Sequence, residues 1–275
     1  MAECFPSSAD LLTSSFLGPY ARPAGSRGSG QLAAEIDAPR RQQVYITLAH
    51  WFEAAKFMPH RPDLRDSVLL SPSIAEANKF ARKHQEHWRS DWKLVRMNVM
   101  VAGMAMLCLQ RPELGLRNQP CKDLVAGMAP LGLPQSFVDG CMTKFEAWRS
   151  APRIAIFGAE VAPDDIVGTR LVKIVSPLPT WTLVTTCHRR TAWRLHDWAL
   201  VHYVPVAYHG TPATRQSRAL VAAMVDAADQ VVVFEQRRAK RFDHVIALAK
   251  ASKRKMALEL YDAPEFGTGG QIAII

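Results

Sequence analysis

The second half of the chain alternates short β-branched runs with helical stretches, and this alternation restricts the possible folds more than any other feature. The β-branched or apolar runs lie at 153–158, 182–185, 202–206 and 230–234. The stretches of helical composition lie at 165–173, 191–200, 213–227 and 239–251. Strands that alternate with helices of about 10 to 15 residues form βαβ units, whose strands lie parallel in one sheet. We therefore expect a Rossmann-like parallel α/β domain over 152–262, followed by a tail at 263–275.

Apolar side chains in the first half recur at helical intervals instead. Those of the first predicted helix are Leu48, Trp51, Phe52, Ala55 and Phe57. Ser73 is a suitable N-cap for a later helix, and Ser90 or Asp91 for another. Residues 18–31 are rich in Gly, Pro, Ser and Arg, which predicts a flexible N-terminal segment over 1–43. The expected fold is thus α/β, with a mainly helical domain at 44–150, a boundary near 150–152 and the Rossmann-like domain after it.

The charge balance points to partners that carry phosphate. The 275 residues include 34 basic and 25 acidic side chains, a formal net charge of +9. Residues 186–255 alone hold 13 basic and 5 acidic side chains, so that this segment carries 13 − 5 = +8. The overall excess favours a nucleotide, a nucleic acid or an anionic lipid without choosing among them, and the basic segment also suits an acidic protein partner.

Cysteine spacing and hydropathy exclude several other classes of protein. The five cysteines contain no C-x-x-C pair, so the sequence indicates neither a disulfide framework nor a zinc site, and it indicates no cofactor. No apolar run reaches 18 residues and no secretory signal is recognisable, so we expect no membrane span. The expected location is intracellular and reducing: the cytoplasm, with an organellar matrix or a virion as alternatives.

Three segments of the first half carry a family pattern. YITLAHWFEAAKF keeps His50, Ala54, Lys56 and Phe57 of the pattern W-P-T-x-E-H-x-x-Q-A-x-K-F, and ANKFAR keeps Ala77 and Arg82 of A-K-x-x-G-R. RSDW keeps Arg89, Asp91 and Trp92, and Met100 follows at the expected distance. Over about 14–114 the chain resembles the NADAR family, which is found in riboflavin-biosynthesis N-glycosidases and ADP-ribosyl-guanine hydrolases. The chain departs from the pattern at Ala49, Glu53 and Ala81, where the family has Glu, Gln and Gly.

The resemblance implies a site that cleaves or binds an ADP-ribose-like or ribosyl-phosphate ligand. Asp91 would polarise the sugar or a water molecule, Lys56 would engage the substrate and Arg82 would contact phosphate. Glu53 lies at i+4 from Ala49, on the same helix face, and could replace the missing carboxylate. His50, Arg89 and Trp92 would complete the ligand contacts. The competing interpretation is structural: His50 and Trp92 as core residues, Lys56 and Arg82 as solvated charges, and Asp91 as a helix N-cap.

Basic residues follow three of the predicted strands. Parallel sheets bind ligands outside the carboxyl ends of their strands, next to helix N-termini that favour anions. The residues expected at this edge are Gly158, Arg189, Arg190, Arg215, Arg218, Arg237 and Arg238. An isolated charge run is as well explained as a solvated turn, but three runs at one edge predict a basic crevice that binds an anion.

The same half resembles the SLOG superfamily of Rossmann-like domains that sense or cleave nucleotide-derived ligands. RIAIFG is similar to the opening strand and glycine of that superfamily, and TRQSRALVAAMVDAADQVVVF to its arginine-containing helix and following strand. The glycine-rich turns of the superfamily fall on 186–190 and 236–242, where this chain has arginines. Three functions therefore remain open: a degenerate binder of a nucleotide-derived or other phosphate-bearing ligand, an active N-glycosidase, and a non-catalytic RNA- or DNA-binding or structural component of an assembly.

Overall fold

The chain forms two compact units. The computed structural model describes residues 16–17, 44–45, 47–110, 132–162, 164–178, 180–186, 195–196, 198–199, 201–210 and 217–262. The main segments of unit 1 are Arg41–Ala151 and His196–Ala207, and those of unit 2 are Pro152–Leu195 and Tyr208–Ile275. The fold is α/β with a Rossmann-like parallel sheet, as the alternating pattern predicts.

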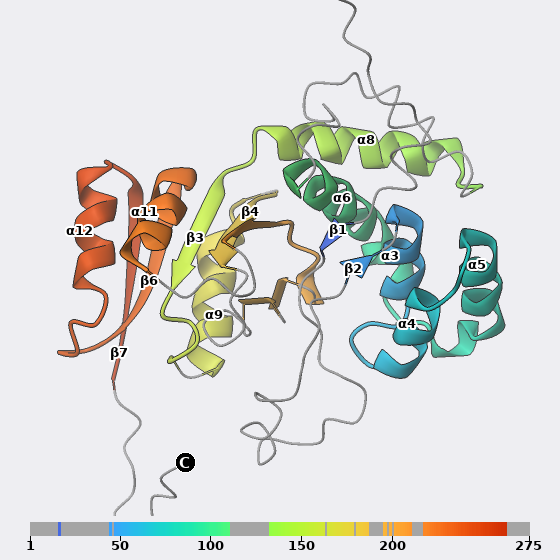
Figure 1. Cartoon of the computed structure of the whole chain (residues 1–275), viewed down its shortest axis with the longest axis horizontal. Coiled ribbons are helices and arrows are strands. Elements are labelled where there is room, and N and C mark those ends of the chain that lie inside the picture. The colour runs from blue at the N-terminus through green and yellow to red at the C-terminus, as the bar shows by residue number, and fades with distance from the viewer. Residues whose placement is uncertain are drawn as a thin grey trace, which may run out of the picture. The chain divides into compact units, whose positions relative to one another are not determined.

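Unit 1 is mainly helical (Figure 1). Its described helices are α3 (Leu48–Ala55), α4 (Pro62–Leu69), α5 (Ile74–Lys83), the 3₁₀ helix η2 (Gln85–His87), α6 (Trp92–Gln110) and α8 (Gln135–Arg149). Two short strands, β1 (Phe16–Leu17) and β2 (Val44–Tyr45), pair antiparallel. The side-chain hydroxyl of Thr47 accepts the backbone N–H of His50 and begins α3, and Ser73 caps α5 in the same way through Glu76.

Helix α3 lies at the centre of unit 1. All eight of its residues are buried, and it contacts α4, α5 and α6. The indole Nε1 of Trp51 donates to the carbonyl oxygen of Val99 at 2.7 Å, which joins α3 to α6. A side chain at Gly103 would place its Cβ only 2.6 Å from Leu48 and Trp51, so glycine permits this close approach. Helix α6 is long and apolar enough to span a membrane, but most of it is buried in the unit, as in the core helix of many soluble proteins.

A segment from far along the chain completes the core of unit 1. Tyr203 belongs to the segment His196–Ala207 and is 5% exposed among the core residues of this unit. Its ring meets that of Trp51 edge-on at 6.3 Å between centroids, and its hydroxyl donates to the carbonyl oxygen of Ala55 at 3.3 Å. Tyr203 therefore packs against α3.

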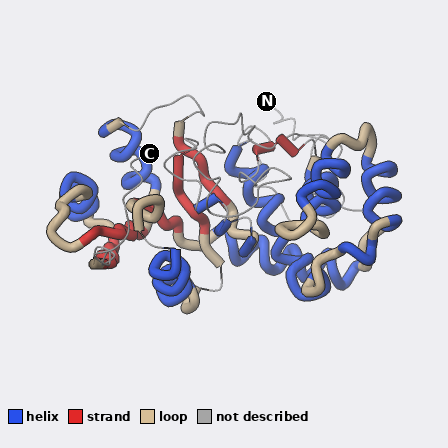
Figure 2. Tube along the Cα trace, turned by 90° about the horizontal axis from the view of Figure 1, so that it is seen from below, coloured by secondary structure: helices blue, strands red, loops and turns tan. Residues whose placement is uncertain are grey.

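Unit 2 contains a five-stranded parallel sheet (Figure 2). In chain order the elements are β3 (Arg153–Phe157), α9 (Asp164–Val175), β4 (Thr182–Thr186), β5 (Val206–His209), α11 (Arg218–Ala227), β6 (Gln230–Gln236), α12 (Asp243–Ala251) and β7 (Lys255–Tyr261). Helix α11 contacts β3 and β4, and α12 contacts β6 and β7. Strand β3 has four buried residues out of five and β4 is buried throughout, as expected for inner strands covered on both faces.

The strand order creates a switch point between β3 and β6. The order in the sheet is β5-β4-β3-β6-β7, so the chain moves outward from β3 to β5 and then returns to pair β6 with the other side of β3. The register sets Ile154 opposite Gln230 and Phe157 opposite Val233. Helices leave β3 and β6 in opposite directions at such a point, and a crevice forms outside the carboxyl ends of the two strands.

One predicted strand is wrong, and two helices begin later than expected. The strand expected at 202–206 runs from Val206 to His209, because Tyr203 has a left-handed φ of 52° and Pro205 has no N–H to donate to a ladder. The helix expected at 239–251 begins at Asp243, after a turn. The helix expected from 213 has its described part at Arg218–Ala227, capped by Ser217, while 213–216 lie outside the described residues.

Candidate functional site

Glu53 and Lys56 form a buried ion pair in the last turn of α3. The Nζ atom of Lys56 lies 2.6 Å from Oε2 of Glu53, and the two side chains are only 7% and 3% exposed. The side-chain amide of Asn78, on α5, donates to the other carboxylate oxygen at 3.4 Å. Burial of two charges needs a close partner for each, and this geometry provides one.

Aromatic rings surround the ammonium group of Lys56. Its Nζ lies 4.4 Å from the ring centroid of Trp88, 5.8 Å from that of Phe52 and 5.9 Å from that of Trp92. The indole of Trp88 is held by a hydrogen bond from its Nε1 to the carbonyl oxygen of Ala81 at 2.9 Å. Burial lowers the pKa of Lys56, although the charge of Glu53 opposes this shift. The rings stabilise the remaining positive charge by cation–π attraction.

A second ion pair joins Arg89 to Asp91 beside the first. The backbone N–H of Arg89 donates to the carbonyl oxygen of Lys56 at 2.8 Å, which ties this segment to the end of α3. The guanidinium of Arg89 donates to both carboxylate oxygens of Asp91, through Nη2 at 2.7 Å and through Nε, and its Nη1 donates to the hydroxyl of Tyr203. These hydrogen bonds lower the pKa of Asp91, whose side chain is 42% exposed. Asp91 is therefore an ionised carboxylate that solvent can reach.

The structure brings together only some of the residues that the NADAR resemblance selects. Glu53, Lys56 and Trp92 share one buried cluster, and Arg89 is hydrogen-bonded to it through the backbone, while the carboxylate of Asp91 pairs with Arg89. Arg82 is exposed on α5, where its charge also lowers the pKa of Lys56.

His50 lies at the other end of α3. Its Nδ1 is 2.8 Å from the hydroxyl of Thr47 and its Nε2 is 3.3 Å from the carbonyl oxygen of Ser71. Burial lowers the pKa of this imidazole. Both ring nitrogens thus have partners within the protein, as in a structural core histidine.

The cluster around Glu53 and Lys56 contains the kinds of groups that take part in acid–base catalysis and cation binding. It combines a carboxylate, an amine whose pKa is lowered, and aromatic faces that attract cations. A carboxylate near a sugar stabilises the oxocarbenium-like cation of glycosidic cleavage and activates water. The exposed carboxylate of Asp91 provides a second group of the same kind.

In unit 2, Gly158 follows β3 at the switch point. It has a left-handed φ of 80°, and a Cβ there would overlap the carbonyl oxygen of Phe234 on β6 and lie 2.9 Å from the ring of Phe242. The position therefore requires glycine for packing as well as for conformation.

A basic turn, residues 237–241, follows β6 on the other side of the switch point. Its charged residues Arg237, Arg238, Lys240 and Arg241 are all exposed. Arg237 forms an exposed ion pair with Asp262, at 3.2 Å between Nε and Oδ1. Arg238 and Lys240 have positive φ angles of 69° and 51°, so the backbone is tightly curled.

The buried carboxylate of Glu235, near the end of β6, is hydrogen-bonded to the residue that follows the basic turn. Its Oε2 accepts the backbone N–H of Phe242 at 2.8 Å, which fixes the start of α12. The backbone N–H of Arg237 donates to the carbonyl oxygen of Tyr261 at 2.8 Å. These N–H groups are engaged within the protein, so an anion at this turn would be held mainly by side chains.

The chain order puts Arg218 on the side of the sheet where β5 ends. It is exposed in the first turn of α11, the helix that returns the chain from β5 to β6 and so starts on the side where β5 ends. The other three predicted contacts, Arg189, Arg190 and Arg215, lie outside the described residues.

From the sequence we did not predict, as site residues, several residues that surround the two ion pairs of unit 1, Glu53 with Lys56 and Arg89 with Asp91. Trp88 lies at i+4 from Trp92, and this spacing was a usable signal. Asn78 and Tyr203 had none, because Asn78 is 25 residues from Glu53 and Tyr203 is 114 residues from Arg89.

No family model matches this chain, and the searches of curated proteins and of solved structures found no match either.

Proposed function

We propose that the protein binds a nucleotide-derived, phosphate-bearing ligand at the switch point of unit 2. The observation that carries this proposal is the placement of the basic turn directly after β6, opposite Gly158 across the switch point. Open parallel sheets bind their ligands at this place. The exposed guanidinium groups of Arg237 and Arg238 suit phosphate, which they can contact with two parallel hydrogen bonds.

The mode of binding would differ from that of a glycine-rich phosphate loop. Such loops bring backbone N–H groups to the phosphate, which requires residues without side chains. Here Phe242 packs against the glycine after β3, and the N–H groups of Arg237 and Phe242 bond to Tyr261 and Glu235. Arginine side chains in the basic turn would take the place of the loop, in a degenerate relative of the SLOG-like domains.

The test is the affinity for ADP-ribose, measured by calorimetry on two doubly substituted proteins. Arg237→Gln with Arg238→Gln removes two charges from the basic turn, and Lys253→Gln with Lys255→Gln removes two from exposed positions at the start of β7 and just before it. We expect the first pair to weaken binding by about tenfold or more, because hydrogen bonds to charged groups are lost, and the second to leave it nearly unchanged.

Two outcomes would contradict the proposal. Equal weakening by both pairs would mean that only net charge matters. Absence of ADP-ribose binding, combined with salt-sensitive binding of single-stranded RNA that the first pair weakens, would instead favour the nucleic-acid-binding alternative.

A second candidate function, N-glycosidase activity, is favoured by the buried ion pair of unit 1. Two charges under aromatic rings contribute little net stability, and apolar residues could fill the same space. A chemical role therefore explains the buried pair of Glu53 and Lys56 better than stability does, with Asp91 as the solvent-accessible carboxylate and Arg82 as a phosphate contact.

This activity predicts release of free ADP-ribose or ribosyl phosphate from N-glycosidic substrates. Glu53→Gln and Asp91→Asn should each abolish turnover while circular dichroism stays unchanged. Lack of hydrolysis of every ADP-ribosylated or ribosyl-amine substrate by the wild-type protein would exclude the activity and leave binding alone.

A further inference from the structure

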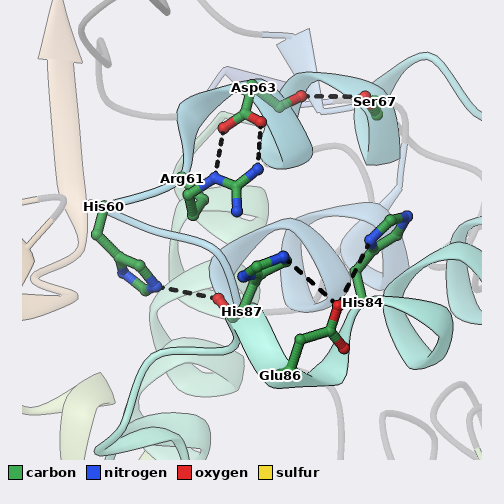
Figure 3. Close-up of polar contacts among 7 residues, drawn as sticks. All are labelled: His60, Arg61, Asp63, Ser67, His84, Glu86 and His87. Atoms are coloured by element: carbon green, nitrogen blue, oxygen red, sulfur yellow. Dashed lines mark hydrogen bonds and ion pairs between the residues drawn. The ribbon is translucent and has the colours of Figure 1, made fainter.

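Three side chains with metal-binding atoms gather at the end of α5 (Figure 3). His84 is the C-cap residue of this helix, and Glu86 and His87 belong to the 3₁₀ helix η2 that follows. Oε1 of Glu86 lies 3.4 Å from Nε2 of His87 and 4.0 Å from Nδ1 of His84. One ligand atom from each residue lies within 4.8 Å of the other two.

The local backbone explains why these side chains converge. Side chains at positions i and i+3 eclipse each other in a 3₁₀ turn, and His84 and His87 have this spacing. Their rings are nearly parallel, at 19° between planes and 6.3 Å between centroids. The turn thus faces both imidazoles the same way, with the carboxylate of Glu86 between them.

Contacts from neighbouring residues hold this arrangement. The ring of His84 packs on that of Phe80 at 4.6 Å between centroids. The Nε2 of His60 is 3.0 Å from the carbonyl oxygen of His87, to which it donates, and this fixes the backbone of the turn (Figure 3). The ring of His84 and the backbone of the turn are therefore held in place before any ion binds.

We propose that His84, Glu86 and His87 bind a divalent transition-metal ion of the zinc class. Bonds of about 2.0–2.2 Å to nitrogen and oxygen place the ligands of a tetrahedral zinc ion roughly 3.3 Å apart. The distance between Oε1 of Glu86 and Nε2 of His87 matches this value, and a small rotation of the exposed Glu86 side chain shortens its 4.0 Å distance to Nδ1 of His84.

The ligand types select the class of metal. Imidazole nitrogen suits Zn²⁺, Cu²⁺, Ni²⁺ and Fe²⁺, whereas Ca²⁺ and Mg²⁺ prefer sites built from oxygen atoms. Three protein ligands leave at least one coordination position for water. The side chains are 26%, 60% and 41% exposed at His84, Glu86 and His87, so an ion can enter without opening the fold.

A metal ion at this turn would affect the stability of unit 1. Trp88, the residue directly after His87, covers the Nζ of Lys56 at 4.4 Å from its ring centroid. A metal ion would clamp the turn that carries this indole and stabilise the native state of unit 1 by mass action. Thermal unfolding should therefore shift to higher temperature when Zn²⁺ is added to metal-free protein.

The experiment measures Zn²⁺ binding to the full chain, produced without a histidine tag and freed of metal by a chelator. Calorimetry gives the affinity, and Co²⁺ provides visible absorption that reports the coordination number. Glu86→Gln and His87→Gln remove one ligand each. His244→Gln, at an exposed position of α12 in unit 2, is the matched control.

We expect Glu86→Gln and His87→Gln each to lower the Zn²⁺ affinity by about tenfold or more and to reduce the Co²⁺ absorption, while His244→Gln leaves both unchanged. Wild-type protein that binds no Zn²⁺ would overturn the proposal, as would variants that bind it as tightly as wild type. Circular dichroism separates a lost ligand from a lost fold, and the nearly isosteric Glu86→Gln decides if His87→Gln does not fold.

Discussion

Replacement of Lys56 by methionine tests whether the buried ion pair of α3 stabilises the fold or serves another purpose. The change keeps an unbranched side chain between Trp88 and Phe52 but removes the charge. Glu53, at 3% side-chain exposure, would keep only the 3.4 Å hydrogen bond from Asn78. A buried carboxylate without a cation is strongly unfavourable.

The expected magnitude follows from the geometry. At 2.6 Å and an effective dielectric constant of about 20, the attraction between the charges is roughly 6 kcal/mol. Removal of both ions from water costs several kcal/mol per ion, so the intact pair contributes little net stability. Lys56→Met alone should lower the free energy of unfolding by about 3–5 kcal/mol, whereas Lys56→Met with Glu53→Met should be neutral or stabilising by about 1–4 kcal/mol.

The assay is a double-mutant cycle by urea unfolding, followed by tryptophan fluorescence and circular dichroism. The control is the same cycle at Arg61 and Asp63, which also lie 2.6 Å apart but are 33% and 50% exposed, and whose coupling should stay below about 1 kcal/mol. Single substitutions at Glu53 and Lys56 whose effects simply add would refute the reasoning, because independent sites couple by less than about 0.5 kcal/mol.

Three further predictions concern other parts of the chain. Gly158→Ala should lower the free energy of unfolding by at least about 3 kcal/mol, because alanine at φ 80° is strained and its Cβ overlaps the carbonyl oxygen of Phe234. The control Gly168→Ala, at an open position of α9, should be neutral or raise the free energy of unfolding by up to about 1 kcal/mol, and equal effects of the two substitutions would contradict the packing argument. Burial raises the pKa of Tyr203 to about 12, so its neutral form stabilises the fold below pH ~10, and this stability is lost towards pH ~12 by up to about 1.4 kcal/mol per pH unit. Urea unfolding at several pH values should show this loss in the wild type but not in Tyr203→Phe, and parallel pH profiles of the two proteins would refute the prediction. Arg237→Gln with Arg238→Gln should also flatten the salt dependence of ADP-ribose binding, as measured by calorimetry at several salt concentrations, and an unchanged slope would mean that the basic turn is not the anion site.

The sheet could be predicted from the sequence because buried parallel strands have a local signal. The β-branched run from Gln230 and the apolar run after Pro152 both became inner strands, and the residues that follow them were assigned to one edge without any knowledge of side-chain contacts. The strand expected at 202–206 was wrong, because Tyr203 belongs to the core of unit 1 instead. A residue whose partners are more than 100 positions away leaves no periodic trace.

The candidate sites were harder to predict, because a family pattern names residues without their partners. The pattern predicts Glu53, Lys56 and Asp91 in one site, but in the fold Glu53 pairs with Lys56 and Asp91 pairs with Arg89. It said nothing of His84 and His87, whose convergence depends on a 3₁₀ turn that interrupts the helical spacing. The sequence shows how many histidines there are but not which of their side chains converge.

Gly158 illustrates why the same residue supports two interpretations and how the structure weighs them. A glycine after the first strand of a Rossmann-like sheet commonly admits a phosphate to the backbone. In this chain the space beside it is taken by the oxygen of Phe234 and the ring of Phe242, so the glycine is already required by packing. Any phosphate at the switch point must then be recognised by groups that reach outward from the edge. The exposed charges at Arg237, Arg238 and Arg218 meet that requirement, which is why the arginines, and not the glycine, decide the proposed function.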